Sequence, residues 1–353
     1  MHQKDLQPRL DLRVGEVVEV RSQEEVLATL DSKGTLEGLP FMPEMLTHCG
    51  KRFTVRKRAH KVCDDISGSG LRRMNAVLLD DVRCDGSAHG GCNAGCPMLW
   101  KEAWLRKVDP LSSSQTSETA SISAATDTVI GLANGRANGC TPEMLVAATR
   151  AMPHDTKSDE ETFSCQATEM LRASGELIPA WSPGQYVEDI RSGNVGFLEF
   201  IRGFMKSAVM PSRWEWRHPL IHGKLKKGTT PSRLLDLQPG EVVRIKSRKE
   251  IVATLDTSNR NRGLSFDKEM LKYCGRMVRV RHRVDRIINE NTGRMIHFKT
   301  DCVVLDDVVC SGDYRRLCPR RNFPYWREIW LERVSDADQQ RYLLIESRKL
   351  ART

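Results

Sequence analysis

The chain has 353 residues, of which 39% are hydrophobic and 29% charged, with eleven cysteines and a formal net charge of +9. Its length suits two domains with connecting segments. Residues 1–15 are polar and no run of eighteen apolar residues occurs, so we expect neither a secretory signal nor a transmembrane segment, and a cytoplasmic location. In a reducing compartment, an odd number of cysteines favours metal ligands or redox groups over structural disulfides.

An internal repeat organises the sequence. Residues 14–31 (VGEVVEVRSQEEVLATLD) match 239–256 (PGEVVRIKSRKEIVATLD), 44–58 match 269–283, 77–84 match 303–310, and 99–108 match 325–334. The repeated unit is about a hundred residues, which is the size of a domain and too long for a solenoid repeat. The chain therefore divides into a first copy (1–110), a Ser/Thr-rich flexible linker (111–128), a mostly helical or irregular middle region (129–231), and a basic second copy (232–353) that carries the positive excess.

In chain order, each copy begins with a short strand and then a short helix with a capping box, formed by Ser22 with Glu25 and by Ser247 with Glu250. A second short helix ends at Gly50 or Gly275, and two alternating strands, a cysteine-containing loop and a Trp-rich segment follow. This pattern predicts a mainly β protein with short helices (α+β). We expect two tandem, small, barrel-like modules, by analogy SH3-like, joined by the partly helical middle region.

Two helices are predicted in the middle region. Residues 140–152 (CTPEMLVAATRAM) have Thr141 as N-cap and Pro142 in the first turn. In the segment 195–210, Phe197, Ile201, Phe204 and Met205 share one helical face, with Arg202 and Lys206 beside it. That face packs on the protein itself or, as an alternative, makes peripheral contact with a membrane surface.

The repeat also predicts which cysteines meet. Antiparallel pairing of the two long strands brings Cys49 near Cys84 and Cys274 near Cys310. The loops that follow bring Cys92 and Cys318 back from equivalent positions toward these pairs. The first copy adds Cys96, where the second has Asn322. The predicted metal ligands are therefore Cys49, Cys84, Cys92 and Cys96 in the first copy, and Cys274, Cys310 and Cys318 in the second. Small buried hydrophobic cysteines are the alternative.

Four thiolates suit tetrahedral zinc or an iron–sulfur cluster. The Cys84, Cys92 and Cys96 spacing is not the CxxC of zinc ribbons, which favours an iron–sulfur cluster as cofactor, with zinc as the alternative. Three thiolates in the second copy leave an open position, which predicts a catalytic role for Cys318, with Cys165 completing the site or acting as a separate thiol. The arginines around Cys318 predict binding of a small anionic substrate or acidic partner: Arg315, Arg316, Arg320 and Arg321.

Other residues leave more than one interpretation open. Cys63 lies at the far end of its strand from Cys49, Cys302 is expected in a strand core, and Cys140 precedes a helix, where a thiol can have a low pKa. His89 is a metal ligand, a proton shuttle or a surface-loop histidine. The tryptophan pairs Trp100/Trp104 and Trp326/Trp330 cover the modules or, alternatively, stack on nucleobases.

The segments RCDGSAHGGCNAGCPMLWKEAWL and CPRRNFPYWREIWLERV, around FSCQATEM, resemble a group of bacterial proteins with a duplicated cysteine-containing module. The resemblance spans nearly the whole chain and implies no particular activity, fold or cofactor. An association with biosynthetic genes suggests a metabolic role.

Three functions follow as hypotheses. The first is an enzyme that holds a metal through cysteines, with an iron–sulfur cluster as the favoured cofactor. It would act in a redox or sulfur-transfer step of a biosynthetic pathway. The second is a zinc-stabilised tandem module that binds nucleic acid or a protein partner through its basic second copy. The third is a membrane-peripheral scaffold that uses residues 195–210.

Overall fold

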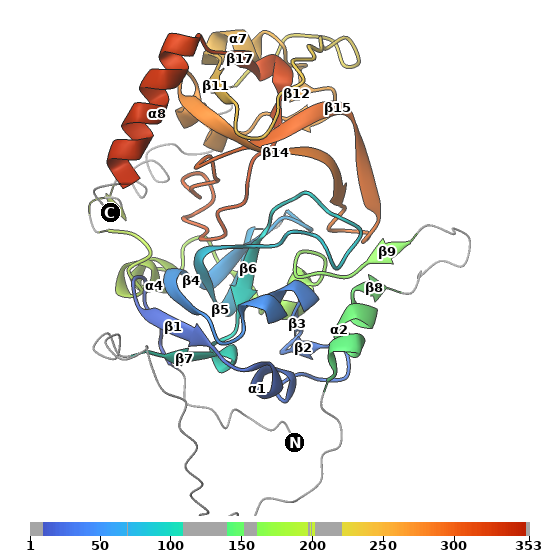
Figure 1. Ribbon diagram of the computed structural model, residues 1–353, viewed down its shortest axis with the longest axis vertical. Helices are drawn as coiled ribbons and strands as arrows, with labels where there is room; N and C mark the ends of the chain where they lie inside the picture. Colours follow the sequence, from blue (N-terminus) through green and yellow to red (C-terminus); the bar gives the residue numbers. More distant parts are fainter. Residues whose placement is uncertain are drawn as a thin grey trace, which may run out of the picture.

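The computed structural model describes residues 10–68, 70–108, 140–151, 161–196, 198, 200, 201 and 221–350. It is mainly β-sheet with few short helices, which confirms the predicted α+β class. Figure 1 shows two lobes, one from the N-terminal third and one from the C-terminal third, with the middle segments beside the N-terminal lobe. We call residues 10–108 the first module and residues 232–350 the second module.

The first module contains a sheet with the strand order β6-β5-β4-β1-β7, and β10 of the middle region also pairs with β5. Its elements are β1 (Val17–Val20), α1 (Gln23–Leu27), β2 (Thr35–Leu36), β3 (Leu39–Pro40), the 3-10 helix η1 (Pro43–His48), β4 (Arg52–Asp64), β5 (Gly70–Arg83), β6 (Pro97–Trp100), η2 (Glu102–Trp104) and β7 (Leu105–Lys107).

The second module has the corresponding strand order, β16-β15-β14-β11-β17. Its elements are β11 (Val242–Ile245), α7 (Arg248–Val252), β12 (Arg260–Asn261), β13 (Leu264–Ser265), η4 (Lys268–Tyr273), β14 (Met277–Ile288), β15 (Met295–Leu305), β16 (Trp326–Arg327), η5 (Glu328–Trp330), β17 (Leu331–Arg333) and α8 (Asp336–Leu350). Within the described residues no pairing joins β6 to β7 or β16 to β17, so the closed barrels suggested by the sequence are not seen.

Local signals place the short helices as predicted. Ser22 caps α1 by accepting a hydrogen bond from the Glu25 N–H, and the Glu25 carboxylate accepts one from the Ser22 N–H. Ser247 and Glu250 form the same capping box at α7. Both boxes satisfy backbone donors that a helix start otherwise leaves free.

Each module has its own hydrophobic core built around two tryptophans, and Ile288 of the second module packs into the core of the first. Trp104 packs edge-on against Phe41 with ring centroids 5.0 Å apart, and Trp330 packs likewise on Phe266 at 5.3 Å. Trp100 and Trp326 are buried beside them. Because all four side chains are fully buried, stacking on nucleobases is excluded for them, and covering the core is their role.

The middle region packs on the first module. Its elements are α2 (Pro142–Ala148), β8 (Arg150–Ala151), β9 (Thr162–Phe163), α3 (Met170–Ala173), β10 (Leu177–Ile178) and α4 (Gly184–Arg191). Leu145, Phe163 and Met170 belong to the same buried cluster as the first module's core. The helix predicted over 140–152 forms as α2 with Thr141 as its N-cap, but it ends at Ala148, and residues 150 and 151 form the strand β8. The linker 111–128 and most of 195–210, including Arg202 and Lys206, lie outside the described residues, so the membrane-facing helix stays a prediction.

Candidate metal and thiol site

Two loops with the same backbone hydrogen bonds follow the long hairpins: loop A (residues 84–96) and loop B (residues 310–322). In loop A the N–H of Cys84 donates to the carbonyl of Cys96 at 2.9 Å. In loop B the N–H of Cys310 donates to the carbonyl of Asn322 at 2.8 Å. Asn322 therefore preserves the backbone of the loop without providing the thiol that Cys96 provides.

Each loop folds tightly over its central cysteine. Gly86 has φ +74°, and a Cβ on it would lie 2.1 Å from the carbonyl oxygen of Cys92. Gly312 has φ +77°, and a Cβ on it would lie 2.6 Å from the nitrogen of Cys318. Both positions require glycine, because any side chain would collide with backbone in a left-handed conformation.

Each loop has three further residues with positive φ, in the left-handed region, but the residue types differ between the loops. Loop A uses glycine at 90, 91 and 95, with φ of +72°, +69° and +60°. Loop B has Arg316, Leu317 and Arg321 at the equivalent positions, with φ of +48°, +59° and +53°. A left-handed residue other than glycine costs about 1–2 kcal/mol, and such strain concentrates at functional sites.

Each loop docks on the hairpin of the other module. The N–H of Ile288, at the end of β14, donates to the Sγ of Cys92 at 3.4 Å. The N–H of Cys63, near the end of β4, donates to the Sγ of Cys318 at 3.2 Å. Ile288 and Cys63 occupy the same position of the sequence repeat, as do Cys92 and Cys318. The contact between the modules is therefore reciprocal.

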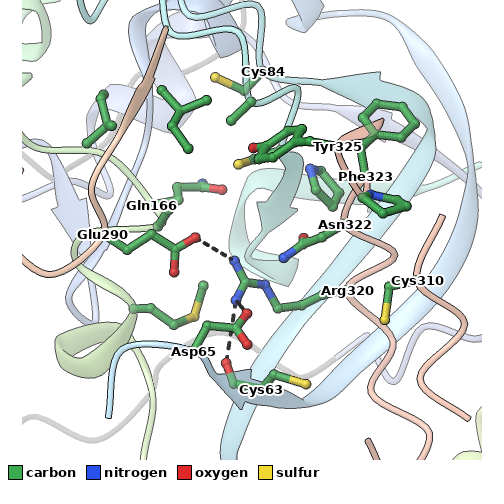
Figure 2. A pocket seen from close by; sticks show the side chains of 18 of the residues that line it. Cys63, Asp65, Cys84, Gln166, Glu290, Cys310, Arg320, Asn322, Phe323 and Tyr325 are labelled. Carbon is green, nitrogen blue, oxygen red and sulfur yellow. Dashed lines mark hydrogen bonds and ion pairs between the residues drawn. The ribbon is translucent and has the colours of Figure 1, made fainter. Parts of the chain in front are cut away.

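A cavity of about 600 Å³ opens where the loops and hairpins meet (Figure 2). Its walls come from both modules and from the middle region, which contributes Gln166 among others. Gln166 is held in place because its Nε2 donates to the carbonyls of Pro40 and Leu99. Seven cysteines line the cavity: Cys63, Cys84, Cys92, Cys96, Cys165, Cys310 and Cys318.

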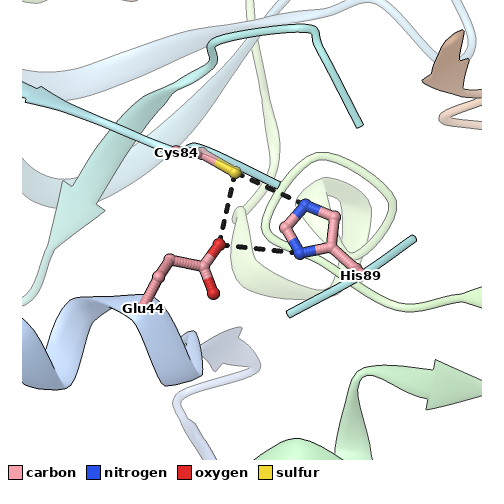
Figure 3. A group of neighbouring side chains, drawn as sticks. All are labelled: Glu44, Cys84 and His89. Atoms are coloured by element: carbon pink, nitrogen blue, oxygen red, sulfur yellow. Dashed lines mark hydrogen bonds and ion pairs between the residues drawn. The ribbon is translucent and has the colours of Figure 1, made fainter. Parts of the chain in front are cut away.

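Cys84 and His89, which both line this cavity, face Glu44 behind them (Figure 3). The Sγ of Cys84 lies 3.3 Å from Oε1 of Glu44 and 3.4 Å from Nε2 of His89. Nδ1 of His89 lies 3.5 Å from the same Glu44 oxygen. Glu44 and His89 are buried, with 7% and 1% of their surface exposed. The alternative that His89 is a surface histidine is therefore wrong.

Burial shifts the protonation of this group. It raises the pKa of the Cys84 thiol well above its ordinary value, and the negative charge of Glu44 adds to the effect. Burial also lowers the pKa of His89, although Glu44 acts in the opposite direction. A neutral imidazole is the form that binds a metal ion, and the thiol must lose its proton when it does.

The predicted cysteine ligands are only partly gathered. Cys92, Cys96 and Cys165 line the cavity together, and burial raises the pKa of Cys96 to about 12, with Cys165 as the next contributor. Cys49 and Cys274 do not line it; each follows a 3-10 helix at its C-terminal end. Within the described residues, no set of three cysteines has its sulfurs within 4.8 Å of one another. In an iron–sulfur cluster, the iron and sulfide atoms lie between the cysteine sulfurs and hold them farther apart than a single ion does. The absence of such a close set therefore does not test the iron–sulfur prediction.

The sequence interpretation missed Cys63. It lies against Cys318 because the end of the β4–β5 hairpin reaches loop B of the other module. Its counterpart Ile288 has no sulfur, so comparison of the two copies did not single it out. Cys302 is in the strand core as predicted. Burial raises the pKa of Cys140, so the low-pKa interpretation of that thiol is wrong.

Three of the four arginines of loop B make ion pairs or hydrogen bonds with other residues of the protein. Arg320 is buried and pairs with Asp65 at 2.9 Å and with Glu290 at 3.9 Å (Figure 2). Arg315 pairs with Asp65 at 2.5 Å and Asp267 at 3.2 Å. Arg316 donates to the carbonyl of Ile178, and Arg321 lines the cavity. An anionic substrate at Arg315 or Arg320 would compete with these carboxylates.

No protein-family model, no curated protein and no solved structure matches the chain. Among the helices that the structure describes, none has the length and apolar character needed to cross a bilayer.

Proposed function

We propose that the chain is a metal-dependent protein that holds one ion of the zinc type at Glu44, Cys84 and His89. The observation that carries this proposal is the group of three ligand atoms lying within 4.8 Å of one another. Oε2 of Glu44 is buried and has no hydrogen-bond partner among the described residues. Leaving such an atom unsatisfied costs about 1–3 kcal/mol, a cost that a bound cation would offset.

The donor set and its spacing favour a single ion. A thiolate, an imidazole and a carboxylate are the ligands that zinc accepts together. At tetrahedral angles, zinc–sulfur and zinc–nitrogen bonds separate their ligand atoms by about 3.6 Å. Cys84 Sγ and His89 Nε2 are 3.4 Å apart, so only a small adjustment is needed.

Three protein ligands leave one coordination position free, which is the arrangement of catalytic rather than structural zinc. A bound ion would act there as a Lewis acid toward a water molecule or a small substrate. The cavity beside it provides about 600 Å³ of space for that substrate. We therefore propose an enzyme acting on a small molecule; its participation in a redox or sulfur-transfer step of biosynthesis stays a prediction.

The second module offers a natural control. Glu269, Cys310 and Arg315 occupy the positions of Glu44, Cys84 and His89. The Glu269 carboxylate accepts hydrogen bonds from Ser311 and from the Tyr314 N–H, and Arg315 adds a positive charge in place of an imidazole. The hydrogen-bonding capacity of the Glu269 carboxylate is met by protein donors, and the positive charge of Arg315 would repel a cation.

The test is metal analysis by mass spectrometry of the full chain purified anaerobically. We expect about one zinc-type ion per chain in the wild type and in Cys310→Ser, and its loss in Cys84→Ser and His89→Gln. Far-ultraviolet circular dichroism confirms that each variant is folded. A wild-type chain free of metal, or full retention of metal in both first-module variants, would overturn the proposal.

An iron–sulfur cluster is the second candidate, supported by Cys92, Cys96 and Cys165, which all line the cavity. The same anaerobic preparation distinguishes it. Stoichiometric iron and acid-labile sulfide with visible absorbance, lost in Cys92→Ser and Cys96→Ser, would support the cluster. Colourless protein with zinc would exclude it.

The matching strand orders support a finer proposal for the fold, that the modules are two copies of one barrel-like, SH3-like unit. An experimental structure that shows each sheet curling toward closure would support it. Binding of nucleic acid or a protein partner by the basic second module stays a prediction, which a salt-dependent binding assay tests.

A further inference from the structure

The reciprocal contact between the modules is chemically different at its two ends. At one end the Sγ of Cys92 faces the backbone of Ile288; at the other the Sγ of Cys318 faces the backbone of a second cysteine, Cys63. We propose that Cys63 and Cys318 form a redox-active dithiol that undergoes thiol–disulfide exchange with a small disulfide entering the cavity. This activity is independent of the ion proposed above.

The fold brings Cys63 and Cys318 together. The N–H of Cys63 donates to the Sγ of Cys318 at 3.2 Å, and Cys318 has the largest influence on the pKa of the Cys63 thiol, which it raises. Both are free cysteines and both line the cavity. They form a small buried cluster with Leu71 and Ile178, apart from the main cores of the modules. Because both residues line the cavity, a small molecule that enters it lies beside the pair.

The surroundings favour Cys318 as the attacking thiolate. Its sulfur accepts a hydrogen bond from the N–H of Cys63. Burial acts to raise the pKa of the Cys318 thiol, but Cys63 and the backbone and guanidinium of Arg320 lower it. Hydrogen-bond donors and a cation stabilise a thiolate. The neighbouring Cys318 and burial raise the pKa of the Cys63 thiol, and the negative charge of Asp65 adds to this effect, which suits Cys63 to the resolving role.

The backbone before Cys318 supports a functional rather than a purely structural role. Arg316 and Leu317, directly before it, are both left-handed residues with side chains. Loop A adopts the same conformation with two glycines at no such cost. Strain of this kind is retained where the position of a reactive group matters.

The exchange balances in two steps. The Cys318 thiolate attacks one sulfur of the small disulfide, breaks its S–S bond, and forms a mixed disulfide while the other half leaves as a thiolate. Cys63 then gives its proton to that leaving thiolate and attacks the Cys318 sulfur, forming the Cys63–Cys318 disulfide and releasing the second half as a thiolate, which takes a proton from water. The small disulfide is reduced to two thiols, the protein dithiol is oxidised, and a small dithiol resets it.

The test uses bis(2-hydroxyethyl) disulfide as the probe on the reduced full chain, with non-reducing peptide mass mapping as the readout. In the wild type we expect a Cys63–Cys318 linked peptide and two released thiols per link. Cys63→Ser should stop at a hydroxyethylthio adduct on Cys318, and Cys318→Ser should form neither link nor adduct at these positions. Cys92→Ser, the matched position in loop A, should link like the wild type.

The same experiment on Cys84→Ser separates this proposal from the metal site. That variant lacks the proposed ion but should still form the link. Absence of the linked peptide in folded wild-type protein would overturn the dithiol, as would an adduct on Cys63 in Cys318→Ser at the wild-type rate. The wild-type measurement depends on no variant, so a misfolded mutant leaves the test intact.

Discussion

The N–H of Ile288 donates a hydrogen bond to the Sγ of Cys92 across the contact between the two modules, with 3.4 Å between nitrogen and sulfur. Cys63 and Cys318 repeat this contact with the modules exchanged. In an isologous dimer, both subunits use the same surface to contact each other. The two modules meet in the same way within one chain. The cavity lies on this contact, so residues of both modules reach it.

Replacing Gly86 by alanine should disrupt loop A. Gly50 has the same φ of +74°, but a Cβ added there would meet no atom within 4 Å, whereas at Gly86 the Cβ would meet the Cys92 carbonyl at 2.1 Å. We expect Gly50→Ala to lower the free energy of unfolding by about 1 kcal/mol and Gly86→Ala to lower it by clearly more. Urea denaturation measures both. Equal losses would show that the close approach to Cys92 does not exist.

The ion pair between Lys61 and Asp189 should anchor α4 of the middle region to β4. Both side chains are fully buried, and Lys61 Nζ lies 2.5 Å from Asp189 Oδ2. Lys61→Met leaves the buried Asp189 carboxylate without its lysine and should cost about 3–5 kcal/mol of unfolding free energy. The double variant Lys61→Met with Asp189→Leu should recover most of this, because an apolar pair replaces two buried charges. A double variant no more stable than the single one would contradict the pairing.

His60 should make stability fall on acidification. Its burial, with a further contribution from the charge of Lys61, lowers its pKa from 6.5 to about 4. The unfolded chain therefore binds a proton below pH 6.5 that the folded chain takes up only near pH 4, so His60 destabilises the folded state progressively as the pH falls through this window. The contribution is at most about 3 kcal/mol.

Asp189 has the opposite effect on stability, in a pH range that overlaps with that of His60. Burial raises its pKa from 3.8 to about 6, although Lys61 acts against the shift, so the folded chain gains stability as the pH falls from 6 toward 4. His60→Gln removes only the first contribution, and its unfolding free energy should rise relative to the wild type between pH 6.5 and 4. Parallel curves for the two proteins in pH-dependent urea titrations would contradict the shift of the His60 pKa.

Glu102 and Glu328 should have equivalent anchoring roles in the two modules. The Glu102 carboxylate accepts hydrogen bonds from the N–H groups of Leu10 and Leu12, and pairs with Arg58 at 2.6 Å. Glu328 accepts from three consecutive N–H groups, at residues 235, 236 and 237. Replacing either by glutamine removes a charged acceptor and should cost about 1.5–3 kcal/mol.

Hydrogen exchange measures where this loss occurs. Because each module has its own core, Glu102→Gln should accelerate exchange mainly in β1 and β4, and Glu328→Gln mainly in β11 and β14. Unchanged exchange in the module that carries the substitution would contradict the anchoring role. Wild-type metal content in Glu328→Gln would further show that the first module's site does not depend on it.

Local patterns in the sequence determined the elements and their order. The capping boxes at Ser22 and Ser247 and the helix after Thr141 are set by hydrogen bonds between near neighbours, which a single sequence displays directly. The repeat marked the two cysteine loops as equivalent, and the corresponding hydrogen bonds of Cys84 and Cys310 agree with that equivalence. The α+β class follows from the same short-range periodicity.

Only the tertiary structure decided which of these residues meet. Cys63 lies beside Cys318, and Cys49 lies away from the cavity, because the modules dock through the ends of their hairpins and not along single strands. His89 is buried with Glu44 because loop A folds back over η1. Such contacts join surfaces far apart in the chain and have no local periodicity, so the sequence identified the thiols while the packing of the two modules determined their partners.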